Sequence, residues 1–72
     1  MVANVSALGK LVSETRKHQN LRQKDLADLA NVSSGFLSDF ENGKPTVELG
    51  KVLRVLETLG LEVDVTPRGN GQ

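Results

Sequence analysis

The sequence contains no cysteine, tryptophan or tyrosine, and it has a single histidine. Without cysteine there is neither a disulfide nor a thiolate metal site, and one histidine argues against zinc. No apolar run is long enough to cross a membrane, and the N-terminus lacks the basic region and apolar stretch of a secretion signal. A phosphate-binding glycine loop and a nucleophile beside a histidine are missing too. We therefore expect a cytoplasmic protein that is not an enzyme, with no catalytic residue, no metal and no cofactor.

Charge of one sign is not in excess either, because the basic and acidic side chains cancel. The charges are nevertheless polarised along the chain: residues 10–24 are basic apart from Glu14, and residues 25–41 carry acids and no base. With 72 residues, the chain is one domain, below the size at which a single core is comfortably stable. Association with a second chain is the remaining way to stabilise so small a domain.

Apolar spacing predicts four short helices followed by one strand. These elements are residues 6–19, 23–30, 34–42, 47–60 and, by strict alternation of apolar and polar residues, 61–66. We expect residues 1–66 to form the domain and residues 67–72 to be a disordered tail.

The ends of the predicted helices carry residues that start and stop helices. The expected N-caps are Ser6, Ser33 and Thr46, and the expected stops are Asn20, Asn31, Gly43 and Gly60. Arg22 is the exception: it stands at the N-cap of the second helix, where its guanidinium cannot accept a hydrogen bond. A local fault of this kind often marks a functional residue.

Each of the four helices has residues at helical spacing that form an apolar face, which we expect to point inward. These faces are Leu8, Leu11, Val12 and Thr15 in the first helix, Leu26, Leu29 and Ala30 in the second, Phe36, Leu37 and Phe40 in the third, and Leu49, Val52, Leu53, Leu56 and Leu59 in the fourth. Val55 lies beside the last stripe and indicates a second buried surface. The opposite face of the third helix is small and polar, and consists of Ser34, Gly35, Ser38, Asp39 and Asn42.

The second and third helices are joined by only three residues, "NVS". This arrangement is a helix-turn-helix, whose second helix lies in the major groove of DNA. Small side chains on its polar face would let that helix approach the base edges closely. Gly35 costs about 1 kcal/mol of helix propensity relative to alanine, which a close approach to the groove wall would explain.

The predicted strand has no partner within a helical bundle, so its backbone groups would be left without hydrogen bonds. It can pair with residues 2–5 of its own chain or with the same strand of a second copy. We prefer the second arrangement because it also supplies the missing stabilisation. Leu61, Val63 and Val65 would then form the dimerisation face.

Residues 21–44, "LRQKDLADLANVSSGFLSDFENGK", resemble the lambda-repressor-like, or Cro-type (XRE), helix-turn-helix family. The positions that match are the Leu-x-Gln before the second helix, the Leu-Ala at 26–27, the Val-Ser at 32–33 and the final "ENGKP". The resemblance covers about residues 6–60 and implies a mainly α bundle that binds double-stranded DNA. Residues 36–65 are also similar to HipB-type antitoxins, which add a short C-terminal strand that pairs across a homodimer.

The resemblance implies which residues meet DNA. Gln23 would hydrogen-bond a phosphate with help from the helix N-terminus, and Arg22 beside it would reach a phosphate too. Asn42 and Lys44 would contact the DNA backbone on the far side. The residues facing the groove would be Ser33, Ser34, Gly35, Ser38 and Asp39.

The resemblance implies a structural role for Arg16 and Glu41, and it leaves two possible roles for Asp39. Arg16 and Glu41 match a partly buried ion pair between the first and third helices of the family. Asp39 would either accept a hydrogen bond from a cytosine amino group or repel phosphates. Because the groove-facing side chains are small, we expect modest direct readout and a larger share from DNA shape.

Two classes of function are compatible with these residues. The first is a dimeric transcriptional repressor of an inverted repeat, with half-site centres about 34–36 Å, or a multiple of that, apart. As a HipB-like antitoxin it would also neutralise a HipA-type serine/threonine kinase toxin and repress their shared operon, and the alternative is a stand-alone, phage-like repressor. The second class is a protein-interaction module with weak DNA binding, which zero net charge and Asp39 favour. The polarised charge and the phosphate-contact positions favour the repressor.

Overall fold

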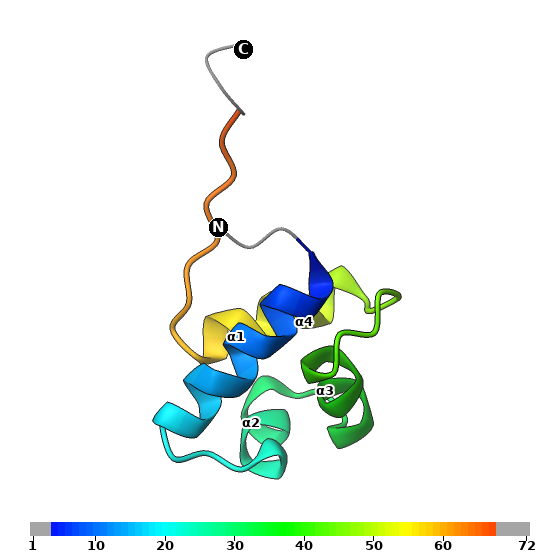
Figure 1. The fold of residues 1–72 in the computed structure, drawn as a ribbon. Coiled ribbons are helices and arrows are strands. Elements are labelled where there is room, and N and C mark those ends of the chain that lie inside the picture. The colour runs from blue at the N-terminus through cyan, green and yellow to red at the C-terminus, as the bar shows by residue number, and fades with distance from the viewer. Residues whose placement is uncertain (1–3, 68–72) are drawn as a thin grey trace.

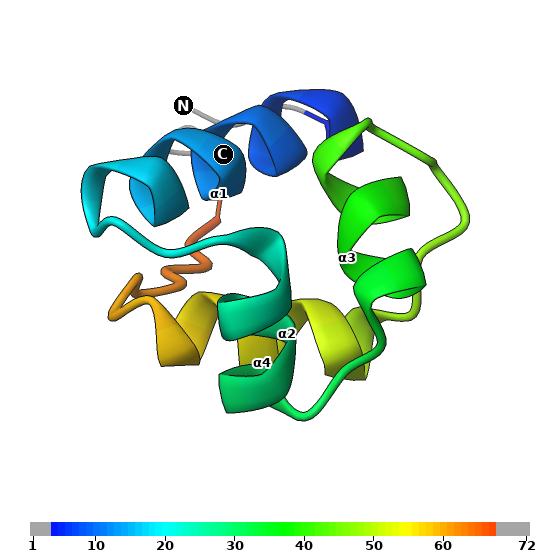
Figure 2. The same ribbon diagram turned by 90° about the horizontal axis from the view of Figure 1, so that it is seen from below.

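The computed structural model describes residues 4–67, in which four helices form a small bundle (Figure 1). They are α1 (Val5–His18), α2 (Gln23–Ala30), α3 (Ser34–Glu41) and α4 (Leu49–Thr58). α3 packs against α1 and α2, and α2 also packs against α4. α1 and α4 run along opposite sides of the bundle when it is seen from below (Figure 2), and α2 and α3 lie beneath both of them (Figure 1). The predicted succession of four helices is confirmed, and none of these helices is both long and apolar enough to cross a membrane.

The first helix begins earlier than expected. Asn4 is its N-cap, since its side-chain oxygen accepts a hydrogen bond from the Ala7 amide at 2.8 Å. The prediction of Ser6 as the N-cap was therefore wrong. Asparagine and serine cap helices about equally well, and the earlier start lets Val5 pack against the core.

The fourth helix begins later than expected. Glu48 is at its N-cap without a side-chain hydrogen bond, so the prediction of Thr46 was wrong. Val47 precedes the cap and packs against the core, and Val52, five residues on, is buried. An apolar pair at these two positions is a hydrophobic staple. Packing of Val47, rather than a capping hydroxyl, thus sets where the helix starts.

The predicted helix ends are confirmed. Asn20 and Asn31 have φ of 61° and 58°, and Gly43 and Gly60 have φ of 86° and 77°. Asparagine and glycine are the residues that tolerate this left-handed conformation best. Each connection therefore turns at a residue suited to it.

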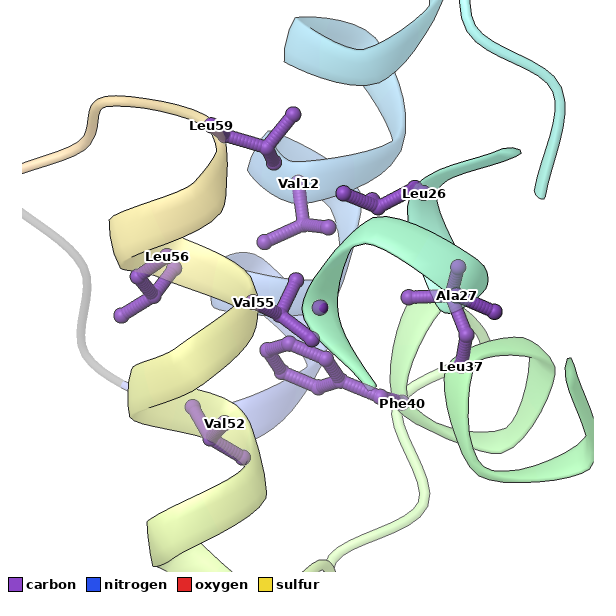
Figure 3. Close-up of a cluster of buried hydrophobic side chains, with 10 residues drawn as sticks. Val12, Leu26, Ala27, Leu37, Phe40, Val52, Val55, Leu56 and Leu59 are labelled. Carbon is purple, nitrogen blue, oxygen red and sulfur yellow. The ribbon is translucent and has the colours of Figure 1, made fainter. Parts of the chain in front are cut away.

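All four helices contribute to one core (Figure 3). Its buried apolar residues are Val12, Leu26, Ala27, Ala30, Leu37, Phe40, Val52, Val55, Leu56 and Leu59. The ring of Phe40 lies beside Val55, and both side chains are fully buried. Val55 thus belongs to the main core, and the expectation of a second buried surface around it was wrong.

Two of the predicted inward faces are rotated in the structure. In α2, Ala27 is buried and Leu29 is 65% exposed, although Leu29 was expected inside. At 100° per residue, Leu29 lies more than a quarter turn from the centre of the face formed by Leu26, Ala27 and Ala30. The short alanines bring α2 close to its neighbours, so the helix turns that face inward.

The inward face of α4 is rotated in the same way, toward Val55. Leu49 and Leu53, which were expected inside, are 67% and 43% exposed. Both lie on the other edge of the apolar stripe. The result is a band of exposed leucines on the outer side of α4.

The C-terminal segment is not a strand in the described chain. Residues 61–66 have no regular secondary structure and extend away from the helices (Figure 1). Leu61 packs against the core, but Val63 and Val65 are exposed. Pairing with the N-terminal segment is excluded at Val5, which is helical. A single strand has nothing to pair with, so the alternating pattern alone does not produce a ladder. Residues 68–72 of the predicted tail lie outside the described residues.

At Gly9, the backbone of α1 lies close to the end of α3. A Cβ added there would overlap the carbonyl oxygen of Phe40 and lie 3.2 Å from the carbonyl carbon of Glu41. These are backbone atoms, so α1 must move away from α3 to accommodate a side chain. We predict that Gly9→Ala lowers the free energy of unfolding by about 2 kcal/mol, measured by urea denaturation.

The matched control for this prediction is Gly50→Ala, because Gly50 is an exposed helical glycine. A Cβ there meets only Glu48 Oε1, at 3.6 Å. This variant should be stabilised by about 0.5 kcal/mol. Equal effects of the two substitutions would contradict the close packing of α1 on α3.

Candidate nucleic-acid interface

A turn of three residues joins α2 to α3. Asn31 takes the left-handed conformation, and the amide of Val32 donates to the carbonyl of Ala27 at 3.0 Å. Ser33 then caps α3, since its Oγ accepts from the Phe36 amide at 2.9 Å. The predicted cap at Ser33 is confirmed. The turn holds α3 at a fixed angle to α2, as a helix-turn-helix requires.

Arg54 of α4 supports this turn, a role that the sequence did not reveal. Its guanidinium donates to the carbonyl of Asn31 at 3.2 Å. A cation at the C-terminus of α2 also opposes the negative end of the helix dipole. The one available signal was a charged residue within the apolar run of residues 52–56.

The apolar face of α3 anchors it to the bundle. Leu37 and Phe40 are fully buried, and Phe36 is half-buried with its ring centroid 6.0 Å from that of Phe40. Lys51 of α4 lies over the Phe36 ring, with Nζ 5.6 Å from the centroid. These contacts fix which face of α3 points outward.

The outward face of α3 carries the small polar residues predicted to read DNA. Ser34, Gly35, Asp39 and Asn42 are exposed and Ser38 is half-buried, and α3 lies at the edge of the bundle in both views (Figures 1 and 2). A Cβ added at Gly35 would meet only Ser33 Oγ, at 3.9 Å. Neither packing nor a left-handed backbone requires glycine at this position. The fold leaves this face open to a ligand.

A buried ion pair holds α1 and α3 together. Arg16 is 7% exposed, and its guanidinium donates to both carboxylate oxygens of Glu41, from Nε at 2.8 Å and from Nη2 at 3.0 Å. Its Nη1 donates to the carbonyl of Leu21 at 2.8 Å. The ion pair implied by the resemblance is therefore present, and the buried guanidinium is well supplied with acceptors.

The same carboxylate holds Gln23, the first residue of α2. Gln23 Nε2 donates to Glu41 Oε1 at 3.0 Å. Burial alone would raise the pKa of Glu41, but the hydrogen bonds from Arg16 and Gln23 outweigh burial and lower that pKa below its ordinary value of 4.5. Glu41 is thus ionised at neutral pH and fixes the Gln23 amide.

The expected fault at the start of α2 is repaired within the chain. The backbone amide of Arg22 donates to Asp25 Oδ2 at 2.9 Å, and the Arg22 guanidinium donates to both oxygens of Asp25 at 3.1 Å. These hydrogen bonds from Arg22 lower the pKa of Asp25. Asp25 therefore supplies one half of a capping box by accepting from the N-cap amide, and this contact together with the ion pair accounts for the arginine without a phosphate. The sequence analysis identified Arg22 as a poor N-cap but missed this hydrogen bond.

Asp39, in the last turn of α3, lies beside Lys44, which follows the helix. Lys44 Nζ is 3.5 Å from Asp39 Oδ2, and both side chains are about half exposed. Gln23, Asn42 and Lys44 thus lie near the C-terminal end of α3, whereas Ser33, Ser34 and Gly35 lie at its N-terminal end. The residues predicted for dimerisation lie apart from both groups, on the C-terminal segment: Leu61, Val63 and Val65.

An exposed polar helix, anchored behind a three-residue turn and flanked by candidate phosphate contacts, defines a helix-turn-helix DNA-binding protein. The chain belongs to the helix-turn-helix family, whose model matches residues 12–65. It is a transcriptional regulator of that family and not an enzyme.

Two relatives support this assignment. Over 62 residues the chain is 52% identical to the uncharacterized HTH-type transcriptional regulator y4mF of Sinorhizobium fredii, covering 86% of this chain and 82% of that protein. Over 58 residues it is 31% identical to the ImmF control region 10 kDa protein of Bacillus phage phi105, covering 81% of this chain and 64% of that protein.

Solved structures share the fold. A HipB–O4 20mer complex and a HipA-HipB-O2-O3 complex each contain a chain with a TM-score of 0.85 to this one. In both, 96% of this chain and 97% of that chain are covered, at 19% sequence identity. At this identity the likeness establishes the fold alone.

The Arg16–Glu41 pair generates a prediction on acid stability. Because the pKa of Glu41 is lowered in the folded state, its stabilising effect is complete above the pKa of the unfolded chain and is lost as pH falls through the folded value. We predict that Glu41→Gln lowers the free energy of unfolding by about 3 kcal/mol at pH 7. The variant should also lose part of the decline in stability that the native protein shows below pH 4.5, measured by urea denaturation at several pH values.

The matched control is Glu14→Gln, which removes an exposed carboxylate from α1. It should change stability by less than about 0.5 kcal/mol. A Glu41→Gln protein as stable as this control at pH 7 would show that the pair is not what joins the helices.

Proposed function

We propose that the protein is a dimeric transcriptional repressor that binds an inverted-repeat operator with α3 in the major groove. The observation that carries the proposal is the open polar face of α3, whose residues are small and whose other face is fixed in the core. Ser34, Gly35, Ser38 and Asp39 would face the base edges, with Ser33 at the start of the helix. The two α3 helices of the dimer would lie about 34–36 Å, or a multiple of that, apart.

The phosphate contacts of this proposal are Gln23, Asn42 and Lys44, with Arg22 as a further exposed cation. The hydrogen bond to Glu41 supports the role of Gln23. Among residues 4–67 it uses one of the two amide protons, which leaves the other to reach a phosphate. Gln23 also stands at the positive end of the α2 dipole. Arg22 and Lys44 each have an acidic neighbour, so their contacts require an exchange of partner.

Close approach of α3 to DNA is tested most directly at Gly35. We predict that Gly35→Ala raises the free energy of unfolding by about 0.5 kcal/mol, because the added methyl group finds open space in the free protein. The same methyl group should weaken operator binding about tenfold by holding α3 away from the bases. Urea denaturation and fluorescence anisotropy measure the two effects.

Gly50→Ala is again the matched control, since Gly50 and Gly35 are both the second residue of their helix. It should be stabilised equally and bind the operator as the native protein does. If Gly35→Ala keeps native affinity, α3 does not approach the groove as closely as proposed.

Dimerisation through the C-terminal segment is the second part of the proposal. Residues 61–66 have apolar side chains on alternate positions and backbone groups in need of partners. A hollow of about 430 Å³ lies between this segment, Leu53 of α4 and Gly60, and another of about 350 Å³ lies between the segment and α1 at Leu8 and Leu11. The same segment of a second copy would pair with this one as a strand and cover the exposed leucines.

Val63 tests this interface. We predict that Val63→Asp raises the dimer dissociation constant about a hundredfold, because pairing would bury an unpaired carboxylate. Sedimentation velocity gives the oligomeric state, and operator binding should be lost together with the dimer.

The matched control is Thr66→Asp, which adds the same charge at a position of the opposite parity in the segment. It should remain dimeric. A Val63→Asp protein that still sediments as a dimer would place the interface elsewhere.

The third part of the proposal is an antitoxin role, in which the protein also binds a HipA-type serine/threonine kinase toxin and represses their shared operon. It is supported by the likeness of the fold to HipB in the HipA-HipB-O2-O3 complex. The similarity to the control-region protein of phage phi105 favours a stand-alone repressor instead. Copurification with the product of an adjacent kinase gene separates these two roles.

A further inference from the structure

The end of α3 has a geometry that brings Lys44 back onto the reading helix. Asn42 is the C-cap and Gly43 follows in the left-handed conformation, with φ of 86°. The amide of Gly43 donates to the carbonyl of Phe40, and the amide of Lys44 donates to the carbonyl of Asp39, both at 3.0 Å. These two hydrogen bonds are a Schellman motif.

The motif places two residues of opposite charge and opposite expected roles side by side. Lys44 is a proposed phosphate contact, and Asp39 is the acid on the groove-facing side of α3. Their side chains pair at 3.5 Å on the surface, where each is about half exposed. Because the backbones are already joined, little additional ordering is needed to form the pair.

We propose that Asp39 is a specificity-determining residue that acts through Lys44, an inference that rests on the proposed DNA-binding function. In the free protein and on non-specific DNA, Asp39 keeps Lys44 paired and withholds it from phosphate. In the operator complex, an amino group on a base edge, from cytosine or adenine, donates to Asp39 in place of Lys44. Lys44 is then released to a phosphate, so the base contact and the phosphate contact form together.

This exchange of partners would explain why α3 carries an acidic residue on the face that meets DNA. On a wrong sequence no base donor replaces Lys44, so forming the phosphate contact leaves Asp39 beside the DNA backbone without a partner. Specificity then comes from weakened binding to competing DNA as much as from strengthened binding to the operator. An exposed ion pair of this kind changes binding by a few-fold, which is the size of effect to expect.

The test is a double-mutant cycle on Asp39→Asn and Lys44→Ala, measured by fluorescence anisotropy on a shuffled duplex and on the duplex upstream of the gene. Asp39→Asn should bind the shuffled duplex about threefold more tightly, and this gain should disappear when Lys44 is alanine. On the upstream duplex Asp39→Asn should not gain affinity, so the ratio of the two affinities falls.

Asp28→Asn is the matched control, because Asp28 is an exposed acid on α2 and the substitution changes the net charge equally. Its effect should be the same with and without Lys44. An equal gain from Asp39→Asn in both backgrounds would mean that Asp39 repels phosphates directly, and would overturn the inference.

Failure of the proposed function gives a different result. Lys44→Ala should by itself weaken binding to the upstream duplex and lower the salt slope there by about one, because the phosphate contact of Lys44 forms in that complex. If Lys44→Ala changes neither the affinity nor the salt slope, Lys44 lies outside the interface. Both the proposed phosphate contact of Lys44 and its control by Asp39 are then wrong. If Lys44→Ala has the expected effect but shows no coupling to Asp39→Asn, the phosphate contact stands and only the control of Lys44 by Asp39 is wrong.

Discussion

The arrangement of this domain depends on the hydrogen bonds and the ion pair of the buried Arg16 guanidinium. It joins α1 to α3 through both oxygens of Glu41 and to the loop before α2 through the carbonyl of Leu21. Glu41 in turn fixes Gln23 at the start of α2. Removing a charge from water is costly unless its hydrogen bonds are replaced, and here one network replaces them. The three helices of the proposed DNA-binding unit are thus set relative to one another by a few polar contacts of defined geometry, while the core supplies most of the apolar burial.

Much of this fold could be predicted because local signals agree with the global arrangement. The left-handed turns at Asn20, Asn31 and Gly43 follow from residue type, and burial of Leu37 and Phe40 follows from helical spacing. The errors arose where neighbours decide between near-equivalent choices. Asn4 and Ser6 are equally good caps, and apolar spacing alone does not show that α4 turns Val55 inward and Leu53 outward. The prediction of a strand at residues 61–66 failed for another reason: a strand requires a partner, and residues 4–67 contain no second strand.

The candidate site is predictable in kind more than in detail. The three-residue turn and the small polar face of α3 could be read from spacing, and the pair of Arg16 and Glu41 from the resemblance to a family. The local partners could not, because they depend on how side chains of similar reach compete for one acceptor. Asp25 takes both the backbone amide and the guanidinium of Arg22, and Asp39 takes Lys44. Under the proposed function, these internal pairs would let a chain of zero net charge carry a DNA-binding surface, because Arg22 and Lys44 would leave their acidic partners for phosphates.

The central claim is that α3 reads an operator as part of a dimer. The most direct measurement is a fluorescence-anisotropy titration of the native protein against the duplex upstream of its own gene, at near-physiological salt, beside a shuffled duplex of equal length. The account predicts saturation at two chains per site and a preference for the upstream duplex of about a hundredfold or more. Weak binding of equal strength to both duplexes would contradict it, and would favour a fold that serves protein contacts instead.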